Sequence, residues 1–195
     1  MKVLPSHGVN PIMALRLPGR LRGAASDMTL RGDDERPIRH LTPWHPAFLI
    51  ATWFGAGLLP RVPGTWGSLA ALPVAWIIVL AGGWTALAAA AALLFLLGWW
   101  ASAAYVDALQ LDDPGAIVVD EVVGQWLVLL VVPHDILLYL LAFILFRVAD
   151  IAKPWPARWA DRYVKGGLGV MLDDILAAPY ALAAMAAVGW WIGRA

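Results

Sequence analysis

The stretch that decides the fold runs from Val62 to Val106 and reads VPGTWGSLAALPVAWIIVLAGGWTALAAAAALLFLLGWWASAAYV. It contains no Asp, Glu, Lys or Arg, and Gly82-Gly83 divides it into two apolar arms, Leu69 to Leu80 and Trp84 to Val106. As a helix the second arm extends about 34 Å, which is enough to cross a hydrocarbon core of about 30 Å, whereas the first arm is marginal. The stretch therefore predicts a helical hairpin in a membrane.

The whole chain is too apolar for a water-soluble monomer. Of its 195 residues, 61% are hydrophobic and 14% are charged, whereas an ordinary soluble domain carries about 25% charged residues. Lysine and arginine together number 14 and so do the acids, so the net charge is zero and nothing indicates nucleic-acid binding. Because cysteine is absent, disulfides, thiolate metal sites and cysteine nucleophiles are excluded.

Further apolar segments follow the first hairpin. Val122 to Val132 and Ile136 to Phe146 flank a short turn and predict a second hairpin with short arms, and Ile175 to Gly193 is uncharged and long enough to cross by itself. Residues 155–165 mix charged and aromatic side chains and predict an interfacial helix. We therefore expect an all-α integral membrane helical bundle of three to five spans, with three if residues 117–152 form a re-entrant hairpin.

The first 40 residues differ from the rest of the chain. They hold one lysine and six arginines against four acids, with scattered Pro and Gly, and predict a disordered basic tail (1–40) ahead of a membrane-embedded domain (41–195). Lysine and arginine also gather in residues 147–174 and are absent from the turns of the two predicted hairpins, Gly82-Gly83 and Pro133 to Asp135. The positive-inside tendency therefore places the tail and residues 147–174 in the cytoplasm.

The acidic residues of the apolar region gather at the predicted cytoplasmic ends of the spans. Ionisable groups at membrane depth are costly, so by default they mark a site. Crowded carboxylates repel one another unless a cation lies among them, and Mg²⁺ prefers carboxylate and phosphate oxygens. The alternative is that each acid caps a helix or pairs with a basic neighbour. The candidate catalytic and metal-binding acids are Asp120, Glu121, Asp150, Asp173 and Asp174.

A basic ridge accompanies these acids. Arg147, Asp150 and Lys153 are spaced so that a helix places the first two side by side on one face. Pro154 and Pro156 are expected to end that helix. Arg147 and Lys153 are candidate phosphate ligands, with Asp150 reaching a metal. The alternative is an ion pair within the helix at a span end.

Two glycine-containing segments could let the backbone approach the same point. Pro63 to Ser68 is expected to be a loop that offers the hydroxyls of Thr65 and Ser68 ahead of an apolar helix. Helix starts favour anions, so a phosphate could rest there, although Ser68 could equally be a plain N-cap. The glycines in residues 166–169 favour a flexible linkage.

Four motifs follow one another along the chain: VPGTWGSL (62–69), DEVVG (120–124), RVADIAKPWP (147–156) and KGGLGVMLDDI (165–175). In this order and spacing they resemble the motifs of the phosphatidylglycerophosphatase A family of bacterial membrane lipid phosphatases, from about Pro43 to the C-terminus. The resemblance implies Mg²⁺-dependent removal of the terminal phosphate from phosphatidylglycerophosphate in a bacterial membrane. We expect this to be the inner membrane, with the site facing the cytoplasm as the basic residues indicate. The predicted tail is longer than the leader usual in the family.

The resemblance also assigns residues to parts of the site, motif by motif. It implies that the glycine segment contributes Thr65 and Ser68, the first acidic pair Asp120 and Glu121, the basic ridge Arg147, Asp150 and Lys153, and the last acidic pair Asp173 and Asp174.

The residues allow this chemistry and leave its details open. Phosphoryl transfer needs neutralisation of the phosphate charge and an in-line nucleophile, which we expect to be water, with an aspartyl-phosphate as the alternative. The expected partner is a phospholipid in the membrane, and the oligomeric state stays open. The alternative function is a transporter or channel subunit that uses the acids as an ion site, but such sites lie near mid-membrane. A purely structural membrane protein would leave the clustered acids unexplained.

Overall fold

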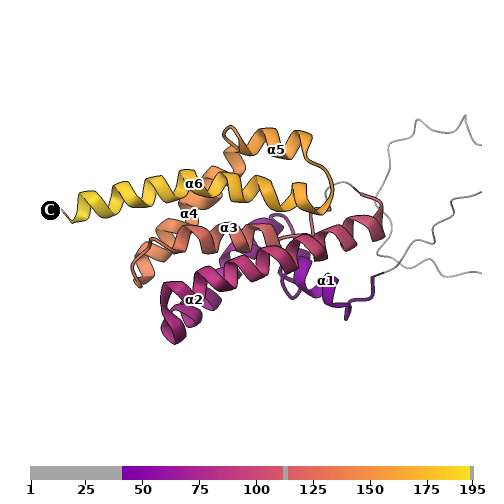
Figure 1. Ribbon diagram of the computed structural model, residues 1–195, viewed down its shortest axis with the longest axis horizontal. Helices are drawn as coiled ribbons and strands as arrows, with labels where there is room; N and C mark the ends of the chain where they lie inside the picture. Colours follow the sequence, from indigo (N-terminus) through magenta and orange to yellow (C-terminus); the bar gives the residue numbers. More distant parts are fainter. Residues whose placement is uncertain (1–40, 112–113, 194–195) are drawn as a thin grey trace, which may run out of the picture. The chain divides into compact units, whose positions relative to one another are not determined.

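The computed structural model describes residues 41–111 and 114–193. Within these ranges every regular element is a helix, which confirms the predicted all-α class. The predicted tail, residues 1–40, lies outside the described residues. The elements are α1 (Pro46–Ala51), the 3-10 helix η2 (Ala56–Leu58), α2 (Pro63–Leu109), α3 (Val119–Leu129), α4 (Ile136–Ala152), α5 (Ala157–Tyr163) and α6 (Gly166–Ile192) (Figure 1).

α2 is a helical hairpin that bends at Gly83. Gly83 has φ 71° and ψ −171°, a conformation that L side chains rarely adopt, so the bend requires glycine. The two arms lie side by side, because the start of α3 contacts both of them. A Cβ atom at Gly67 would lie 2.7 Å from the side chain of Val118, and one at Gly98 would lie 3.1 Å from that of Val119. The predicted hairpin with a glycine break is confirmed.

The first arm of this hairpin is longer than predicted. α2 begins at Pro63, so the segment Pro63 to Ser68 is helical and the expectation of a loop is wrong. Proline suits the first helical position because the N–H that it lacks would have no intrahelical partner there. Residues 63–82 extend about 30 Å as a helix, which is enough to cross a hydrocarbon core.

Replacing Gly83 by alanine should destabilise the protein by about 1–3 kcal/mol. A Cβ at this position would meet no atom within 4 Å, so the cost comes from the backbone conformation alone. Thermal unfolding in detergent, followed by circular dichroism, measures the effect. The matched control is Gly189→Ala in α6, where a Cβ also meets nothing within 4 Å and alanine favours the helix. Equal melting temperatures for the two variants would show that the bend does not need glycine.

α3 lies at the centre of the bundle, packed against α2, α4 and α6. Nearly all of its side chains are buried. Trp126 of α3 donates its indole N–H to the carbonyl of Ala71 on α2, at 3.0 Å. The turn after α3 reaches the bend of α2, where the indole of Trp84 donates to the carbonyl of Val132 at 3.2 Å. α3 and α4 form the second hairpin that the sequence predicts.

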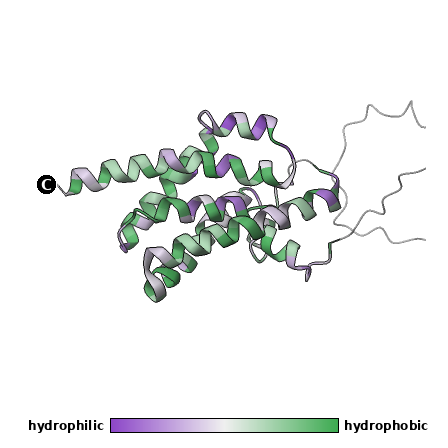
Figure 2. Ribbon diagram, viewed as in Figure 1, coloured by the Kyte–Doolittle hydropathy of each residue, from purple (hydrophilic) through white to green (hydrophobic). Residues whose placement is uncertain are grey.

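Two of the described helices, α2 and α6, are long and apolar enough to cross a membrane. In α6 the uncharged part from Ile175 to Ile192 extends about 27 Å, and hydrophobic residues run along both α2 and α6 (Figure 2). Large apolar side chains such as Ile77 and Leu80 remain 64% and 68% exposed. α3, with 11 residues, extends only about 17 Å and is too short to cross. The chain is a membrane helical protein, as predicted.

The segment between α4 and α6 also follows the prediction. α4 ends before Pro154, and Lys153 caps it in a left-handed conformation with φ 42°. α5 is the helix expected in the amphipathic stretch, and it packs alongside α6 (Figure 1). Trp155, Trp159 and Tyr163 are exposed, which suits a helix that lies against lipid headgroups.

The glycines of residues 166–169 lie inside α6, so the expected flexible linkage is wrong. Gly167 and Gly169 serve close packing instead. A Cβ at Gly167 would lie 2.2 Å from the backbone nitrogen of Ala103 on α2, and one at Gly169 would lie 2.1 Å from the carbonyl oxygen of Val164. This packing fixes the start of α6, the helix that carries the last acidic pair.

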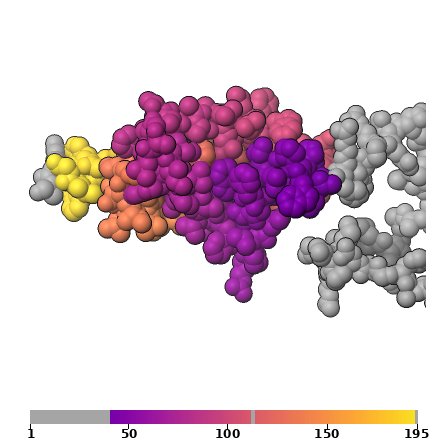
Figure 3. Space-filling model, turned by 90° about the horizontal axis from the view of Figure 1, so that it is seen from below, coloured from indigo at the N-terminus to yellow at the C-terminus, as the bar shows by residue number. Residues whose placement is uncertain are grey.

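α1 supports the start of α3. Its C-terminal residue Ala51 accepts a hydrogen bond from the N–H of Val118 at 2.8 Å, just before α3 begins. The ring of Phe48 stacks on Tyr105 of α2, with ring centroids 5.8 Å apart, and Figure 3 shows α1 against the surface of α2. The position of the first acidic pair is therefore set by contacts from both α1 and α2.

Candidate active site

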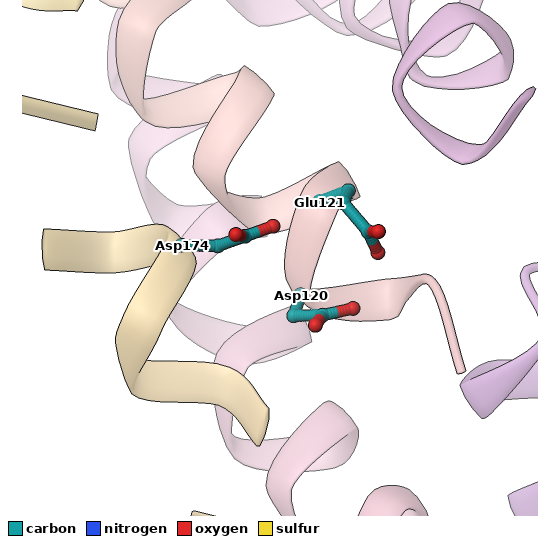
Figure 4. Close-up of side chains that lie close together, drawn as sticks. All are labelled: Asp120, Glu121 and Asp174. Carbon is teal, nitrogen blue, oxygen red and sulfur yellow. The ribbon is translucent and has the colours of Figure 1, made fainter. Parts of the chain in front are cut away.

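Three acidic side chains meet where α3 begins. Asp120 and Glu121 stand in the first turn of α3, and Asp174 comes from α6. One oxygen of each residue lies within 4.8 Å of the others, and Figure 4 shows the three side chains where the two helices meet. Asp120 is 8% exposed and Asp174 is 2% exposed. The fold therefore gathers acids that are far apart in the sequence into one largely buried cluster.

Two glycines make room for this cluster. Gly64 lies in the first turn of α2, and a Cβ there would be 2.0 Å from Oε1 of Glu121 and 3.1 Å from Nη1 of Arg147. Gly124 lies on α3, and a Cβ there would be 2.5 Å from the ring of Phe146. Larger residues at these two positions would displace the side chains around the site.

Several oxygens of the cluster have no partner among the described residues. Asp120 Oδ1, Glu121 Oε2 and Asp174 Oδ2 are buried and make no hydrogen bond. Burial, followed by the nearby charge of Glu121, raises the pKa of Asp120 well above its ordinary value, and burial also raises the pKa of Glu121. Because unpaired buried oxygens are costly, a cation bound among them would provide the interactions that they lack.

Arg147 ties α4 to both neighbouring helices. Its Nη1 lies 2.6 Å from Oδ2 of Asp150 and 3.9 Å from Oε1 of Glu121. The same nitrogen donates to Oγ of Ser68 at 3.3 Å, and that hydroxyl donates to the carbonyl of Gly64 at 2.9 Å. Ser68 is therefore not an N-cap, and Arg147 is held among three side chains of the site.

Lys153 bridges α5 and α6. Its Nζ lies 2.5 Å from Oδ1 of Asp161 and 2.6 Å from Oδ2 of Asp173. Burial alone would lower the pKa of Lys153, but the hydrogen bonds and charges of the two aspartates outweigh it and raise the pKa above its ordinary value. Lys153 therefore stays protonated at neutral pH, and it holds Asp173 at the edge of the cluster.

These groups border one cavity of about 200 Å³. All five acids singled out in the sequence line it, and so does Lys153. The other three candidate phosphate ligands, Arg147, Thr65 and Ser68, are not among the described residues that line the cavity. The structure thus brings the acids to one place and separates Lys153 from the remaining phosphate candidates.

Two further charged residues border the cavity without having been assigned to the site from the sequence. They are Asp161 and Lys165, both in the stretch predicted as an interfacial helix. Lys165 directly precedes α6, so its position just ahead of the helix that carries Asp173 and Asp174 was a usable signal. The place of Asp161 depends on the turn between α5 and α6, for which the sequence offered no signal.

Comparison with known proteins connects this cavity to a family. A family model described as phosphatidylglycerophosphatase A matches residues 49–189. The matched range contains every described residue that lines the cavity.

Individual relatives match over most of their length. Phosphatidylglycerophosphatase A of Escherichia coli K12 is 39% identical over 141 residues, which cover 72% of this chain and 80% of that protein. The protein of the same name from Haemophilus influenzae is 38% identical, with coverage of 82% and 98%. A Bacteroides thetaiotaomicron protein provisionally described as a phosphatidylinositol-3-phosphatase is 41% identical, with coverage of 76% and 98%. No solved structure gives a significant match. The chain belongs to the phosphatidylglycerophosphatase A family, as its four motifs predicted.

Proposed function

We propose that this protein hydrolyses the terminal phosphate monoester of phosphatidylglycerophosphate, giving phosphatidylglycerol and inorganic phosphate in a Mg²⁺-dependent step of phospholipid biosynthesis. Family membership supports the activity, because two relatives carry its name. The observation that carries the proposal is the cluster of Asp120, Glu121 and Asp174, whose adjacent and unpaired oxygens border a cavity.

The donor set suits a hard divalent cation. Asp120, Glu121 and Asp174 would hold Mg²⁺, which prefers carboxylate oxygens together with water and substrate phosphate oxygens. Zinc or copper would favour thiolate or imidazole ligands, but the chain has no cysteine and the described lining of the cavity has no histidine. When bound, the ion would neutralise negative charge on the phosphate.

The other charged residues of the site receive positioning and binding roles. Lys153 borders the cavity, so we assign it contact with phosphate oxygens while its bond to Asp173 keeps its ammonium group in place. Arg147 lies behind the lining and holds Asp150 and Glu121 by ion pairs. The two basic residues of the ridge thus receive different roles, because only Lys153 lines the cavity.

Water is the proposed nucleophile, and one of the cavity acids accepts its proton. The five acids share the metal-binding and base roles. An aspartyl-phosphate formed on one of these acids is the alternative. Acid quenching during turnover distinguishes the two routes, because only the alternative leaves phosphate covalently attached to the protein.

We further propose that the chain crosses the bacterial inner membrane several times, with the cavity facing the cytoplasm. The cavity lies at the start of α3, and beyond Asp174 the rest of α6 is uncharged as far as Ile192. Basic residues concentrate in residues 147–174, near this end of α6, which is the distribution that favours a cytoplasmic location. A transporter or channel has less support, because the relatives are named as phosphatases.

The proposal is tested with purified protein in detergent micelles. Phosphate release is measured from phosphatidylglycerophosphate, phosphatidic acid and phosphatidylinositol 3-phosphate, with Mg²⁺ and with a chelator. We expect release to be fastest from phosphatidylglycerophosphate, to stop with chelator and to return when Mg²⁺ is added in excess. Faster release from phosphatidylinositol 3-phosphate would make that lipid the substrate in place of phosphatidylglycerophosphate. It is the lipid in the description of the Bacteroides relative. Turnover that persists with chelator would contradict the proposed dependence on Mg²⁺.

A further inference from the structure

Among the described residues that line the cavity, Lys165 is the positively charged one whose side chain has no partner. Of the two described lysines that border the cavity, Lys153 is held by Asp161 and Asp173 at 2.5 Å and 2.6 Å. Lys165 is exposed, and its side chain makes no hydrogen bond or ion pair with any described residue. Arg147 is paired with Asp150 and lies outside the lining. The cavity therefore offers one uncommitted ammonium group to an anionic ligand.

The position of Lys165 places this group at the rim of the cavity. Lys165 precedes the first residue of α6 and lies about 13 Å along the helix axis from Asp174. It follows α5, whose exposed Trp159 and Tyr163 are suited to a bilayer surface. Because Lys165 and Asp174 are nine residues apart but border the same cavity, one ligand with two anionic groups could contact both ends of it.

We propose that Lys165 forms a second anion subsite, which binds the phosphodiester of the lipid headgroup while the terminal phosphate lies at the carboxylate cluster. The inference rests on the proposed function, because it takes its ligand from the proposed substrate. Phosphatidylglycerophosphate carries two phosphates joined by a glycerol, and the cluster and the rim supply two separate places for them. The subsite would make the enzyme selective for lipids whose reacting phosphate is attached beyond a phosphodiester.

The experiment compares wild type, Lys165→Gln and Lys165→Arg in mixed micelles. The KM for phosphatidylglycerophosphate is measured together with inhibition constants for two products. Phosphatidylglycerol carries only the phosphodiester, and inorganic phosphate resembles only the reacting group. We expect Lys165→Gln to raise the KM and the inhibition constant of phosphatidylglycerol by about 10-fold, with kcat and inhibition by phosphate unchanged. Lys165→Arg should restore most of the affinity, and the difference should shrink at high salt.

Arg162→Gln is the matched control, because it removes a positive charge from exposed α5 at a residue that is not part of the described lining. It reports the general attraction of anionic lipid to this surface, and its constants should stay within about twofold of wild type. If the inhibition constant of inorganic phosphate rose as much as that of phosphatidylglycerol in Lys165→Gln, Lys165 would lie at the reacting phosphate and the proposed subsite would be overturned. Unchanged constants, or equal changes in Arg162→Gln, would overturn it as well. If the wild type itself released no phosphate from this lipid, the proposed function would fail first, and the inference with it.

Discussion

The Asp174→Asn protein is expected to release phosphate on the order of 10³-fold more slowly than wild type, which corresponds to about 4 kcal/mol of transition-state stabilisation. Asp120→Asn should behave in the same way. Each substitution keeps the size of the side chain and removes one carboxylate from the cluster of Asp120, Glu121 and Asp174. Phosphate release from phosphatidylglycerophosphate under saturating Mg²⁺ measures the loss.

When Mg²⁺ is removed, the same variants should be more stable than wild type, although they are less active. In wild type the buried oxygens Asp120 Oδ1 and Asp174 Oδ2 have no partner among the described residues, so a neutral amide relieves repulsion in the metal-free protein. Saturating Mg²⁺ at 100 times its Kd should stabilise wild type by about 2.7 kcal/mol, and this gain should largely disappear in the variants. Melting temperatures measured with Mg²⁺ and with chelator separate the two effects.

Asp107→Asn is the control for these variants, because Asp107 is an exposed acid near the end of α2 and is not part of the described cavity lining. It should keep wild-type turnover and the full stabilisation by Mg²⁺. If Asp120→Asn and Asp174→Asn also kept both, the carboxylate cluster would not be the metal site. Loss of turnover with unchanged stabilisation by Mg²⁺ would assign the acids a role other than metal binding.

The apolar pattern was sufficient to predict most of the fold. The absence of charge over Val62 to Val106 indicated a segment that faces lipid or is deeply packed. Gly82-Gly83 indicated a break between two helical arms within it. Helix boundaries were harder, because Pro63 to Ser68 contains both helix-starting and loop-favouring residues. Packing decided the outcome there. Gly64 lies against Glu121 and Gly67 against Val118, and these close contacts favour a compact helix over an open loop.

The acids of the site were predictable as a group, whereas their pairing was not. Ionisable groups at membrane depth are costly and mark a site by default, so the sequence indicated that the acids belong together and that Asp150 lies beside Arg147. The ion pair between Lys153 and Asp173 came only with the structure. Which cation faces the cavity depends on side-chain direction after the helices pack. Arg147 turns toward Ser68 of α2 and leaves the lining, while Lys153 lies past the end of α4 and reaches it.

Gly64→Ala is expected to lower kcat/KM by about 10- to 100-fold and to raise the Mg²⁺ concentration needed for half-maximal activity. A Cβ at Gly64 would lie 2.0 Å from Oε1 of Glu121, so the carboxylate must move out of its place. The atom that it meets is the end of a flexible side chain, which can move without unfolding the protein. Alanine also favours the helix that Gly64 occupies, so the melting temperature should stay equal to that of wild type or rise.

Gly115→Ala separates this effect from a general sensitivity of the cavity to added methyl groups. Gly115 also borders the cavity, but a Cβ there meets no atom within 4 Å, so its activity and Mg²⁺ requirement should match those of wild type. Steady-state kinetics over a Mg²⁺ titration, together with thermal unfolding, compare the two variants. If Gly64→Ala kept wild-type kinetics, the position of Glu121 would not matter for the reaction. A loss confined to Gly64→Ala, in a protein at least as stable as wild type, would mean that catalysis depends on where this one carboxylate is held.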